Sequence, residues 1–319
     1  MPEPSPVRVL VVAPLVDASF GRLAERHPVI DRRDGLGRVT VDGMTAEERA
    51  GVEVVVTSGI VGLGAAQMDL LPGLRLVHCF GVGFEGVDIS AATARGIAVT
   101  NAPNTNAATV ADHTLGLMLA AARGFGETGR GARAGQWNET RRRYRPTLNR
   151  ARVGMLGLGV IGQQIARRVE AFEAEVAYTA RSAKPNLPYR FVPDLLDLSR
   201  ASDFLVVAAP GGADTRHLVN AAVLDALGPE GVLVNIGRGS IVDTAALVTA
   251  LAEGRICGAG LDVIEEEPEV PPALAALDNA IITPHIAGRS PAALARQCDC
   301  ALETFAALRS GADFPSRIA

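Results

Sequence analysis

The chain has 319 residues, of which 48% are hydrophobic and 21% are charged. This length and composition predict a soluble protein with two domains and ample hydrophobic core. The net charge of −4 argues against a general nucleic-acid-binding surface, and no uninterrupted apolar run reaches the length of a membrane span. Residues 1 to 6 contain three prolines and no basic segment, so we expect no signal peptide and a cytoplasmic location.

The four cysteines, Cys79, Cys257, Cys298 and Cys300, do not have the spacing of a metal site. In a cytoplasmic protein they are expected to be reduced thiols. We therefore expect no bound metal.

The N-terminal third of the chain predicts strands that alternate with helices. Strands are expected at residues 7–12, 52–57, 74–79 and 97–100, with a helix at 18–26. Such an order predicts a parallel sheet, whose ligands lie beyond the carboxyl ends of the strands. This rule makes Ser58, Gly59, Val82 and Gly83 candidate ligand contacts, although simple turn chemistry also accounts for Gly59.

A long helix rich in Ala, Leu and Met is expected at residues 107–123. The next segment, residues 124–144, is irregular, begins with several glycines and contains the only tryptophan, Trp137. It is too long for a simple connector inside a compact domain. Its basic run, residues 141–145, is typical of a solvated loop; the alternatives are a subunit contact or a charged rim near an anionic ligand.

The central motif is Gly157-Leu158-Gly159-Val160-Ile161-Gly162, which fits G-x-G-x-x-G. An apolar strand pattern precedes it and a helical pattern follows it, which is the context that a dinucleotide-binding turn requires. Gly157 permits the tight turn, Gly159 lets the backbone approach a pyrophosphate, and Gly162 lets the helix pack on the strand. The alternative is a glycine-rich turn without a ligand.

Six strands are expected in this second series, at residues 153–156, 175–178, 204–208, 232–235, 258–261 and 280–283, followed by a terminal helix at 291–309. The predicted fold class is α/β, with two doubly wound parallel-sheet domains. A flavodoxin-like substrate domain would comprise residues 1–101 and 289–319. A Rossmann dinucleotide-binding domain, residues 102–288, would be inserted into it.

Four ionisable residues of the second domain, Arg238, Asp262, Glu267 and His285, each follow a predicted strand. They are expected to gather at one edge of the sheet. A histidine can supply the proton that a carbonyl oxygen needs as hydride arrives, and a neighbouring carboxylate fixes its tautomer. An arginine can bind a substrate carboxylate with paired hydrogen bonds. Taken singly, three of them have an alternative: a structural role for His285, a solvated acidic loop at 265–267 for Glu267, and a helix cap or a pair with Asp243 for Arg238.

On these stretches the sequence resembles the D-isomer-specific 2-hydroxyacid dehydrogenases over nearly its whole length. The matching stretches are residues 96–103, 110–113, 157–162, 235–243, 261–268 and 283–288. The resemblance implies that His285 is the general acid/base, Glu267 its partner and Arg238 the substrate-binding arginine. It also implies that the backbone at Val82 and Gly83 binds the substrate carboxylate and that Asp262 faces the nicotinamide.

Within the family, the sequence looks most similar to the NADPH-dependent glyoxylate/hydroxypyruvate reductases. A fold that prefers NAD places an acid at the end of the second strand, where this chain has Thr179 and Ala180. Arg181, Ser182 and Lys184 follow, and are suited to a 2′-phosphate. The other expected cofactor contacts are the six residues of the glycine motif and Ala209, Pro210, Thr215, Ile236, Gly237, Arg238, Asp262, His285 and Gly288.

The sequence therefore predicts an NADPH-dependent reductase of glyoxylate or hydroxypyruvate, with NADH as a second donor. The alternatives are a 2-ketogluconate or aryl-2-oxoacid reductase of the same family, and a dinucleotide-sensing corepressor. The expected partners are the 2-oxo acid and a second copy of the chain, with no nucleic acid and no membrane. In the resembling family the segment after the long helix embraces a second subunit, which predicts a homodimer.

Overall fold

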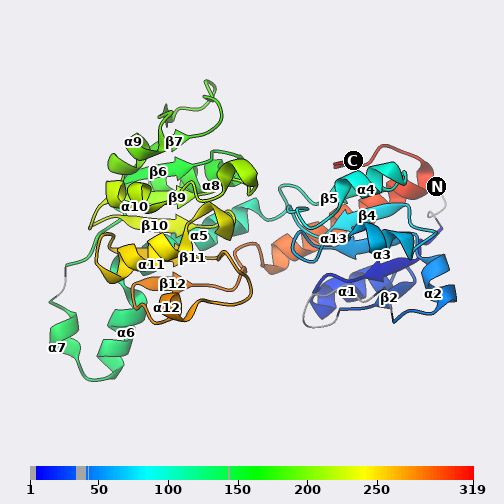
Figure 1. Cartoon of the computed structure of the whole chain (residues 1–319), viewed down its shortest axis with the longest axis horizontal. Helices are drawn as coiled ribbons and strands as arrows, with labels where there is room; N and C mark the ends of the chain where they lie inside the picture. The colour runs from blue at the N-terminus through cyan, green and yellow to red at the C-terminus, as the bar shows by residue number, and fades with distance from the viewer. Residues whose placement is uncertain (1–4, 34–40, 42, 143) are drawn as a thin grey trace. The chain divides into compact units, whose positions relative to one another are not determined.

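A computed structural model of the chain describes residues 5–33, 41, 43–142 and 144–319. The chain divides into two compact units (Figure 1). The first unit comprises Met1–Asn106 and Ser290–Ala319, and the second comprises Ala107–Arg289. Both units are built on parallel sheets, so the predicted α/β fold class is confirmed.

The first unit contains a five-stranded sheet in the order β2-β1-β3-β4-β5. Its strands are β1 (Val9–Val11), β2 (Val29–Asp31), β3 (Val54–Thr57), β4 (Leu76–Cys79) and β5 (Ala98–Asn101), all paired in parallel. This order is that of flavodoxin-like folds, with a topological switch point between β1 and β3. The segment 58–64, which follows β3, therefore lies where such sheets bind ligands.

Helices cover both faces of this sheet because successive strand residues point to opposite sides. Val9 and Val54 pack in one core with residues of α1 and α13, whereas Leu10 and Val55 pack in the other with residues of α3 and α4. The helices are α1 (Asp17–Ala24), α2 (Ala46–Gly51), α3 (Ala65–Asp69), α4 (Ile89–Ala94) and α13 (Pro291–Ser310). The C-terminal residues complete the sheet edge, where Ile318 N donates to Val99 O at 2.8 Å.

The second unit contains a seven-stranded parallel sheet in the order β12-β11-β10-β9-β6-β7-β8. Its strands are β6 (Arg152–Leu156), β7 (Glu175–Thr179), β8 (Arg190–Phe191), β9 (Phe204–Val207), β10 (Val232–Asn235), β11 (Gly258–Leu261) and β12 (Ala280–Ile282). Six were expected; the seventh, β8, has only two residues and no strand-like sequence pattern. The order is that of a Rossmann fold, and it reverses between β6 and β9.

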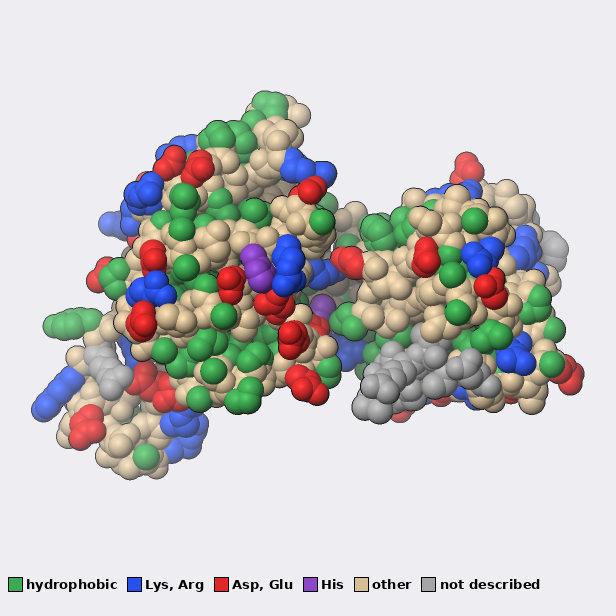
Figure 2. All heavy atoms as spheres, in the orientation of Figure 1, with side chains coloured by type: hydrophobic (Ala, Val, Ile, Leu, Met, Phe, Trp, Pro, Cys, Tyr) green, Lys and Arg blue, Asp and Glu red, His purple; other side chains and the backbone are tan. Residues whose placement is uncertain are grey.

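The segment after the long helix α5 (Ala107–Arg123) was expected to be irregular, and this expectation was wrong. It forms the helices α6 (Phe125–Arg133) and α7 (Trp137–Thr140), which stand away from the sheet of the second unit (Figure 1). Ion pairs of Arg130 with Asp278 and of Glu127 with Arg145 hold this arm. Basic side chains occupy part of its surface (Figure 2). Arg145 is thus largely buried rather than solvated, and Arg143 lies outside the described residues.

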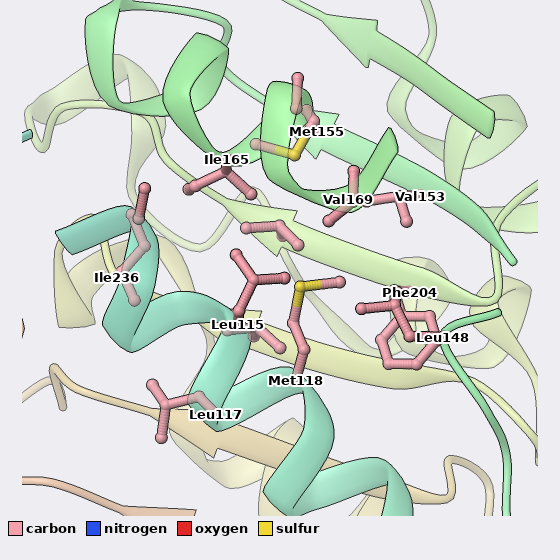
Figure 3. Close-up of a cluster of buried hydrophobic side chains, with 14 of the residues drawn as sticks. Leu115, Leu117, Met118, Leu148, Val153, Met155, Ile165, Val169, Phe204 and Ile236 are labelled. Atoms are coloured by element: carbon pink, nitrogen blue, oxygen red, sulfur yellow. The ribbon is translucent and has the colours of Figure 1, made fainter. Parts of the chain in front are cut away.

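The helix α5 is the central helix of the second unit and packs on one face of its sheet (Figure 3). Leu115, Leu117 and Met118 lie in one core with residues of β6, β9 and β10 and of α8 (Val160–Val169). A Cβ atom added to Gly260 of β11 would lie 2.9 Å from Leu117 Cβ, so this glycine allows α5 to approach the strand closely. The opposite face is covered by α9 (Leu195–Arg200), α10 (Ala221–Leu227) and α11 (Thr244–Ala252), with α12 (Pro272–Ala275) beside them.

Two further observations concern the whole chain. Among the described residues, no helix is both long and apolar enough to cross a bilayer. All four cysteines are free thiols, and burial raises the pKa of the Cys79 thiol to about 12.

Candidate functional site

The glycine motif forms the turn between β6 and α8, beside the switch point of the Rossmann sheet. Gly157 has φ +95°, and a Cβ atom there would lie 2.9 Å from Ala208 O. A Cβ atom on Gly162 would lie 2.7 Å from Gly157 O, whereas one on Gly159 would meet no protein atom within 4 Å. The first and third glycines therefore serve the turn itself, and the second leaves open space. This arrangement fits a dinucleotide pyrophosphate at the N-terminus of α8.

Neighbouring strand ends extend this site along the carboxyl edge of the sheet. Gly157 N donates to Thr179 O at 2.9 Å, which ties the turn to the end of β7. A Cβ atom on Gly237 would lie 2.6 Å from Ala209 O, so the segments after β9 and β10 touch. Thr215 Oγ1 donates to Pro210 O at 3.1 Å. The predicted cofactor residues after β9 and β10 thus adjoin one another.

The end of β7 carries the residues expected to distinguish the two dinucleotides. Thr179 is buried and donates its hydroxyl proton to Pro193 O at 3.2 Å. Arg181 and Ser182 are exposed. Lys184 is half-buried, and its backbone N donates to the buried Tyr178 hydroxyl at 2.6 Å. Arg181 and Ser182 are therefore accessible to a phosphate, while the Lys184 backbone is fixed at the base of the turn.

His285 and Glu267 meet directly at the same edge. His285 Nδ1 lies 2.8 Å from Glu267 Oε2, and the two side chains are 35% and 25% exposed. Because a carboxylate only accepts hydrogen bonds, Nδ1 carries a proton and donates it. Within the described part of the chain, His285 Nε2 makes no hydrogen bond. Glu267 therefore holds Nδ1, and Nε2 is left for proton transfer.

The carboxylate of Asp262 is buried beneath the segment that carries His285. Its Oδ1 accepts from Ile286 N at 3.0 Å and its Oδ2 accepts from Ala287 N at 2.9 Å. His285 N donates to the backbone O of Asp262 at 2.9 Å. Asp262 thus shapes the loop of residues 283–287, and Gly288 follows directly.

Arg238 lies at the end of β10. The segment that carries it packs against Ile264 and Glu265, which precede Glu267 in the chain. A Cβ atom on Gly239 would lie 1.9 Å from Ile264 O, so only glycine fits between these two segments. Arg238 is half-buried, and its Nη1 donates to Gly237 O at 2.8 Å. Three of the four ionisable residues, Asp262, Glu267 and His285, are joined by hydrogen bonds within one loop cluster, and the segment of Arg238 adjoins it.

A second histidine–glutamate pair lies beside the first. His217 Nε2 lies 2.7 Å from Glu265 Oε1, which is also 2.9 Å from Arg216 Nη2, and Thr244 Oγ1 donates to Glu265 Oε2 at 3.1 Å. Burial acts to raise the pKa of Glu265, but the hydrogen bonds from His217 and Thr244 outweigh it, and the pKa is lowered. Glu265 is therefore an ionised side chain held by His217, Arg216 and Thr244, rather than part of a solvated acidic loop.

The remaining predicted contacts lie in the first unit, at the carboxyl edge of its own sheet. A Cβ atom on Gly59 would lie 2.6 Å from the carbonyl carbon of Gly83, so the segments after β3 and β4 are in contact. Ser58 Oγ accepts from Val61 N at 3.2 Å, and the Asn101 side chain donates to Val82 O at 2.7 Å. Within the described residues, the N–H groups of Val82 and Gly83 donate no hydrogen bond. They are available to an anionic ligand.

Comparison with known proteins agrees with this geometry. The model of the family described as D-isomer specific 2-hydroxyacid dehydrogenase, NAD binding domain, matches residues 115–287. The chain belongs to this family. It is 43% identical over 235 residues to the hydroxyphenylpyruvate reductase of Plectranthus scutellarioides, covering 74% of this chain and 75% of that protein. It is 42% identical over 238 residues to a glyoxylate/hydroxypyruvate reductase of Arabidopsis thaliana, covering 75% and 76%.

A solved structure of the family is similar along almost the entire chain. It is the NADPH-dependent glyoxylate/hydroxypyruvate reductase of Sinorhizobium meliloti in complex with NADP and malonate. The TM-score is 0.88 at 40% identity, covering 99% of this chain and 97% of that one. The relatives are reductases, so this family member is an oxidoreductase, and the corepressor alternative is disfavoured.

Sequence reasoning did not assign a role to three polar residues that hold the site. His217 and His113 bond to segments that carry Glu267 and His285, and Asn101 bonds to the segment that carries Val82 and Gly83. Asn101 and His113 belong to stretches that match the family, which was the only signal for either residue. No local pattern links any of the three to its partner.

Proposed function

We propose that this protein reduces a small 2-oxo acid, glyoxylate or hydroxypyruvate, to the D-2-hydroxy acid with NADPH. The observation that carries the proposal is the 2.8 Å hydrogen bond between His285 and Glu267, in the unit that contains the dinucleotide turn. The relatives named glyoxylate/hydroxypyruvate reductase support this substrate class. The coarser assignment, a 2-hydroxyacid dehydrogenase, follows from the family itself.

Each residue has a distinct role in this proposal. Arg238 binds the substrate carboxylate, since a guanidinium matches its two oxygens. The N–H groups of Val82 and Gly83 bind the same carboxylate, and the turn at Ser58 and Gly59 borders it. His285 donates the Nε2 proton to the carbonyl oxygen. When bound, the nicotinamide cofactor supplies the hydride.

Glu267 orients His285 for this proton transfer. It accepts the Nδ1 proton, which fixes the ring orientation and stabilises the imidazolium that donates from Nε2. The preference for NADPH rests on Arg181 and Ser182, which offer donors to a 2′-phosphate where no acid holds a ribose hydroxyl. NADH remains a second donor because the pyrophosphate site is common to both cofactors.

The proposal also assigns a binding role to each unit. Residues 1–101 with 289–319 form the substrate-binding domain, and residues 102–288 form the NAD(P)-binding domain. The match of the NAD-binding-domain model to residues 115–287 supports the second assignment.

A second candidate is an aryl-2-oxoacid reductase. Three apolar side chains, Ile60, Val82 and Phe84, are 66%, 36% and 37% exposed on the two segments of the first unit that touch at Gly59 and Gly83. Exposed apolar side chains beside a carboxylate site suit a substrate with an apolar side chain. The similarity to a hydroxyphenylpyruvate reductase points the same way.

We further propose that the protein is a cytoplasmic homodimer. The arm of α6 and α7 carries Phe125 and Trp137, which are 58% and 65% exposed, and Tyr144 beyond it is fully exposed. Aromatic residues are enriched at protein interfaces, which supports pairing of this arm with a second copy, with Trp137 extending toward the partner's site. Free thiols at all four cysteines support a reducing compartment.

The decisive test is the loss of absorbance at 340 nm when purified protein is mixed with NADPH and a panel of 2-oxo acids. The panel contains glyoxylate, hydroxypyruvate, 2-ketogluconate and phenylpyruvate. The main proposal predicts the highest kcat/KM for glyoxylate or hydroxypyruvate. A maximum at phenylpyruvate would establish the second candidate, and no oxidation of NADPH with any member would refute both.

A further inference from the structure

A polar network connects the long helix α5 to the loop of His285. Thr283, which opens that loop, donates its hydroxyl proton to the buried Asp262 Oδ1 at 2.6 Å. On the other side, His113 of α5 places Nε2 2.9 Å from Thr283 Oγ1 and 3.4 Å from Asp262 Oδ1. His113 and Thr283 are thus partners across 170 positions of sequence.

The direction of these hydrogen bonds follows from the chemistry of the groups. Asp262 can only accept, so the hydroxyl proton of Thr283 points to it. Thr283 Oγ1 is then left as an acceptor for His113, whose Nε2 must carry a proton. His113 therefore donates into the threonine–aspartate pair and adds a fourth polar contact, besides the Thr283 hydroxyl and two backbone N–H groups, around a carboxylate that is 3% exposed.

The loop needs such support because its backbone is unusual. His285 has φ 53°, a left-handed conformation that side chains with a Cβ atom rarely adopt and that neighbouring contacts must maintain. The helix α5 is a firm support, since Leu117 and Met118 are buried against the sheet (Figure 3). His113 lies one helical turn before Leu117.

We infer that His113 is a positioning residue for the reduction step: through Thr283 and Asp262 it holds the 283–287 loop in the conformation that keeps His285 Nδ1 on Glu267. This inference rests on the proposed function for its kinetic consequence. It assigns His113 no contact with substrate or cofactor.

The test replaces the ring with groups that differ in hydrogen bonding. His113→Phe removes the donor at similar size, and His113→Gln retains an amide donor close to the position of Nε2. In the phenylalanine variant kcat should fall about 10- to 100-fold, the range for losing a hydrogen bond in a charged network. KM for NADPH should stay within about twofold, and the glutamine variant should recover most of kcat. Thr283→Val, which breaks the link from the other side, should reproduce the loss.

Asp112→Asn is the matched control. Asp112 precedes His113 on α5 and pairs with Arg168 of α8 at 2.7 Å, so its replacement perturbs the same helix without touching the network. Its kcat should remain within about twofold of that of the unmodified protein. A purely structural role for His113 would instead lower melting temperature, NADPH affinity and kcat together, with no recovery in the glutamine variant, and would overturn the inference.

A second measurement does not depend on turnover. In ¹⁵N-histidine NMR spectra, the His285 ring signals should report a bonded Nδ1 in the unmodified protein and in Asp112→Asn, and should change in His113→Phe. Unchanged His285 signals in His113→Phe would overturn the inference. If the unmodified protein reduced no 2-oxo acid, the proposed function would fail, and these spectra would still decide whether His113 positions His285.

Discussion

At the scale of single residues, the imidazole of His285 is held at Nδ1 by Glu267 and makes no hydrogen bond at Nε2 among the described residues. This asymmetry is what a proton donor to a carbonyl oxygen requires. Neither side chain is fully buried, so the pair can exchange its proton with solvent between turnovers.

The first prediction concerns the two members of this pair. His285→Ala should lower the rate of 2-oxo acid reduction by ~10²–10⁴, the usual contribution of general acid catalysis. Glu267→Gln should also lower the rate, because a neutral amide holds the Nδ1 proton more weakly than a carboxylate does. Steady-state kinetics of the two variants would measure both effects, and an unchanged rate in the glutamine variant would mean that Glu267 has another role.

The second prediction concerns cofactor choice. A charge-assisted hydrogen bond is worth roughly 1.5–3 kcal/mol, so Arg181→Ala should raise KM for NADPH about 10- to 100-fold. KM for NADH should change little, because NADH lacks the 2′-phosphate. Lys184→Ala is the comparison, since the Lys184 backbone is tied to Tyr178. Equal losses with both cofactors in the Arg181 variant would show that Arg181 is structural.

At the scale of elements, β4 of the first unit carries an unusual residue on its inner side. His78 is completely buried against Phe305 of α13, with its Nδ1 2.9 Å from Thr100 Oγ1, and its Nε2 has no hydrogen-bond partner among the residues that the structure describes. Burial lowers the pKa of His78 to about 4, because the charged ring would lose its hydration. The packing of α13 on the sheet therefore requires a neutral imidazole.

The third prediction follows from this lowered pKa. The stability that depends on neutral His78 is complete above the usual histidine pKa of about 6.5 and is lost as pH falls toward 4. The free energy of unfolding falls by about 3 kcal/mol in total. About 2 kcal/mol of this is lost by pH 5, before most carboxylates titrate. His27, whose pKa is also lowered chiefly by burial, acts in the same direction.

Amide hydrogen exchange of peptides that contain β4 would measure this loss, because the single Trp137 lies in the other unit and does not report on it. His78→Gln, which cannot be protonated in this range, should lose much less protection between pH 7.5 and pH 5. His27→Gln serves as the matched control and should retain most of the pH dependence. An equal loss of amide protection with falling pH in the unmodified protein and in His78→Gln would contradict the prediction.

Element boundaries differ in how far local sequence determines them. The helix α5 and the strands β10 and β11 begin and end where expected, because apolar runs and flanking polar residues bound them. β2 and β8 were missed because they are short and partly exposed edge strands. The helix α6 was missed because its glycines disfavour a helix, whereas a close contact at Gly131 with Thr140 and ion pairs with distant residues stabilise it.

At the scale of the whole molecule, the fourth prediction concerns assembly. Light scattering at micromolar concentration should give twice the 33.2 kDa mass of the chain. Trp137→Asp should shift the mass toward that of one chain, since a charge replaces an apolar interface contact. Arg150→Glu, which reverses a charge at an exposed position beyond the arm, should leave the mass unchanged. A monomeric mass for the unmodified protein would remove the proposal.

The sequence by itself determined the α/β class, the two series of strands apart from the edge strands β2 and β8, the dinucleotide turn and the residues that follow the strand ends. These features depend on short-range rules: strand periodicity, the torsion freedom of Gly157, and the gathering of parallel strand ends at one edge. Only the tertiary structure decided which polar groups pair there. His113 with Thr283, His217 with Glu265 and Asn101 with Val82 join segments that no local pattern connects. Their contacts depend on how each helix and loop packs against its sheet, which is a property of the assembled core rather than of any one stretch of sequence.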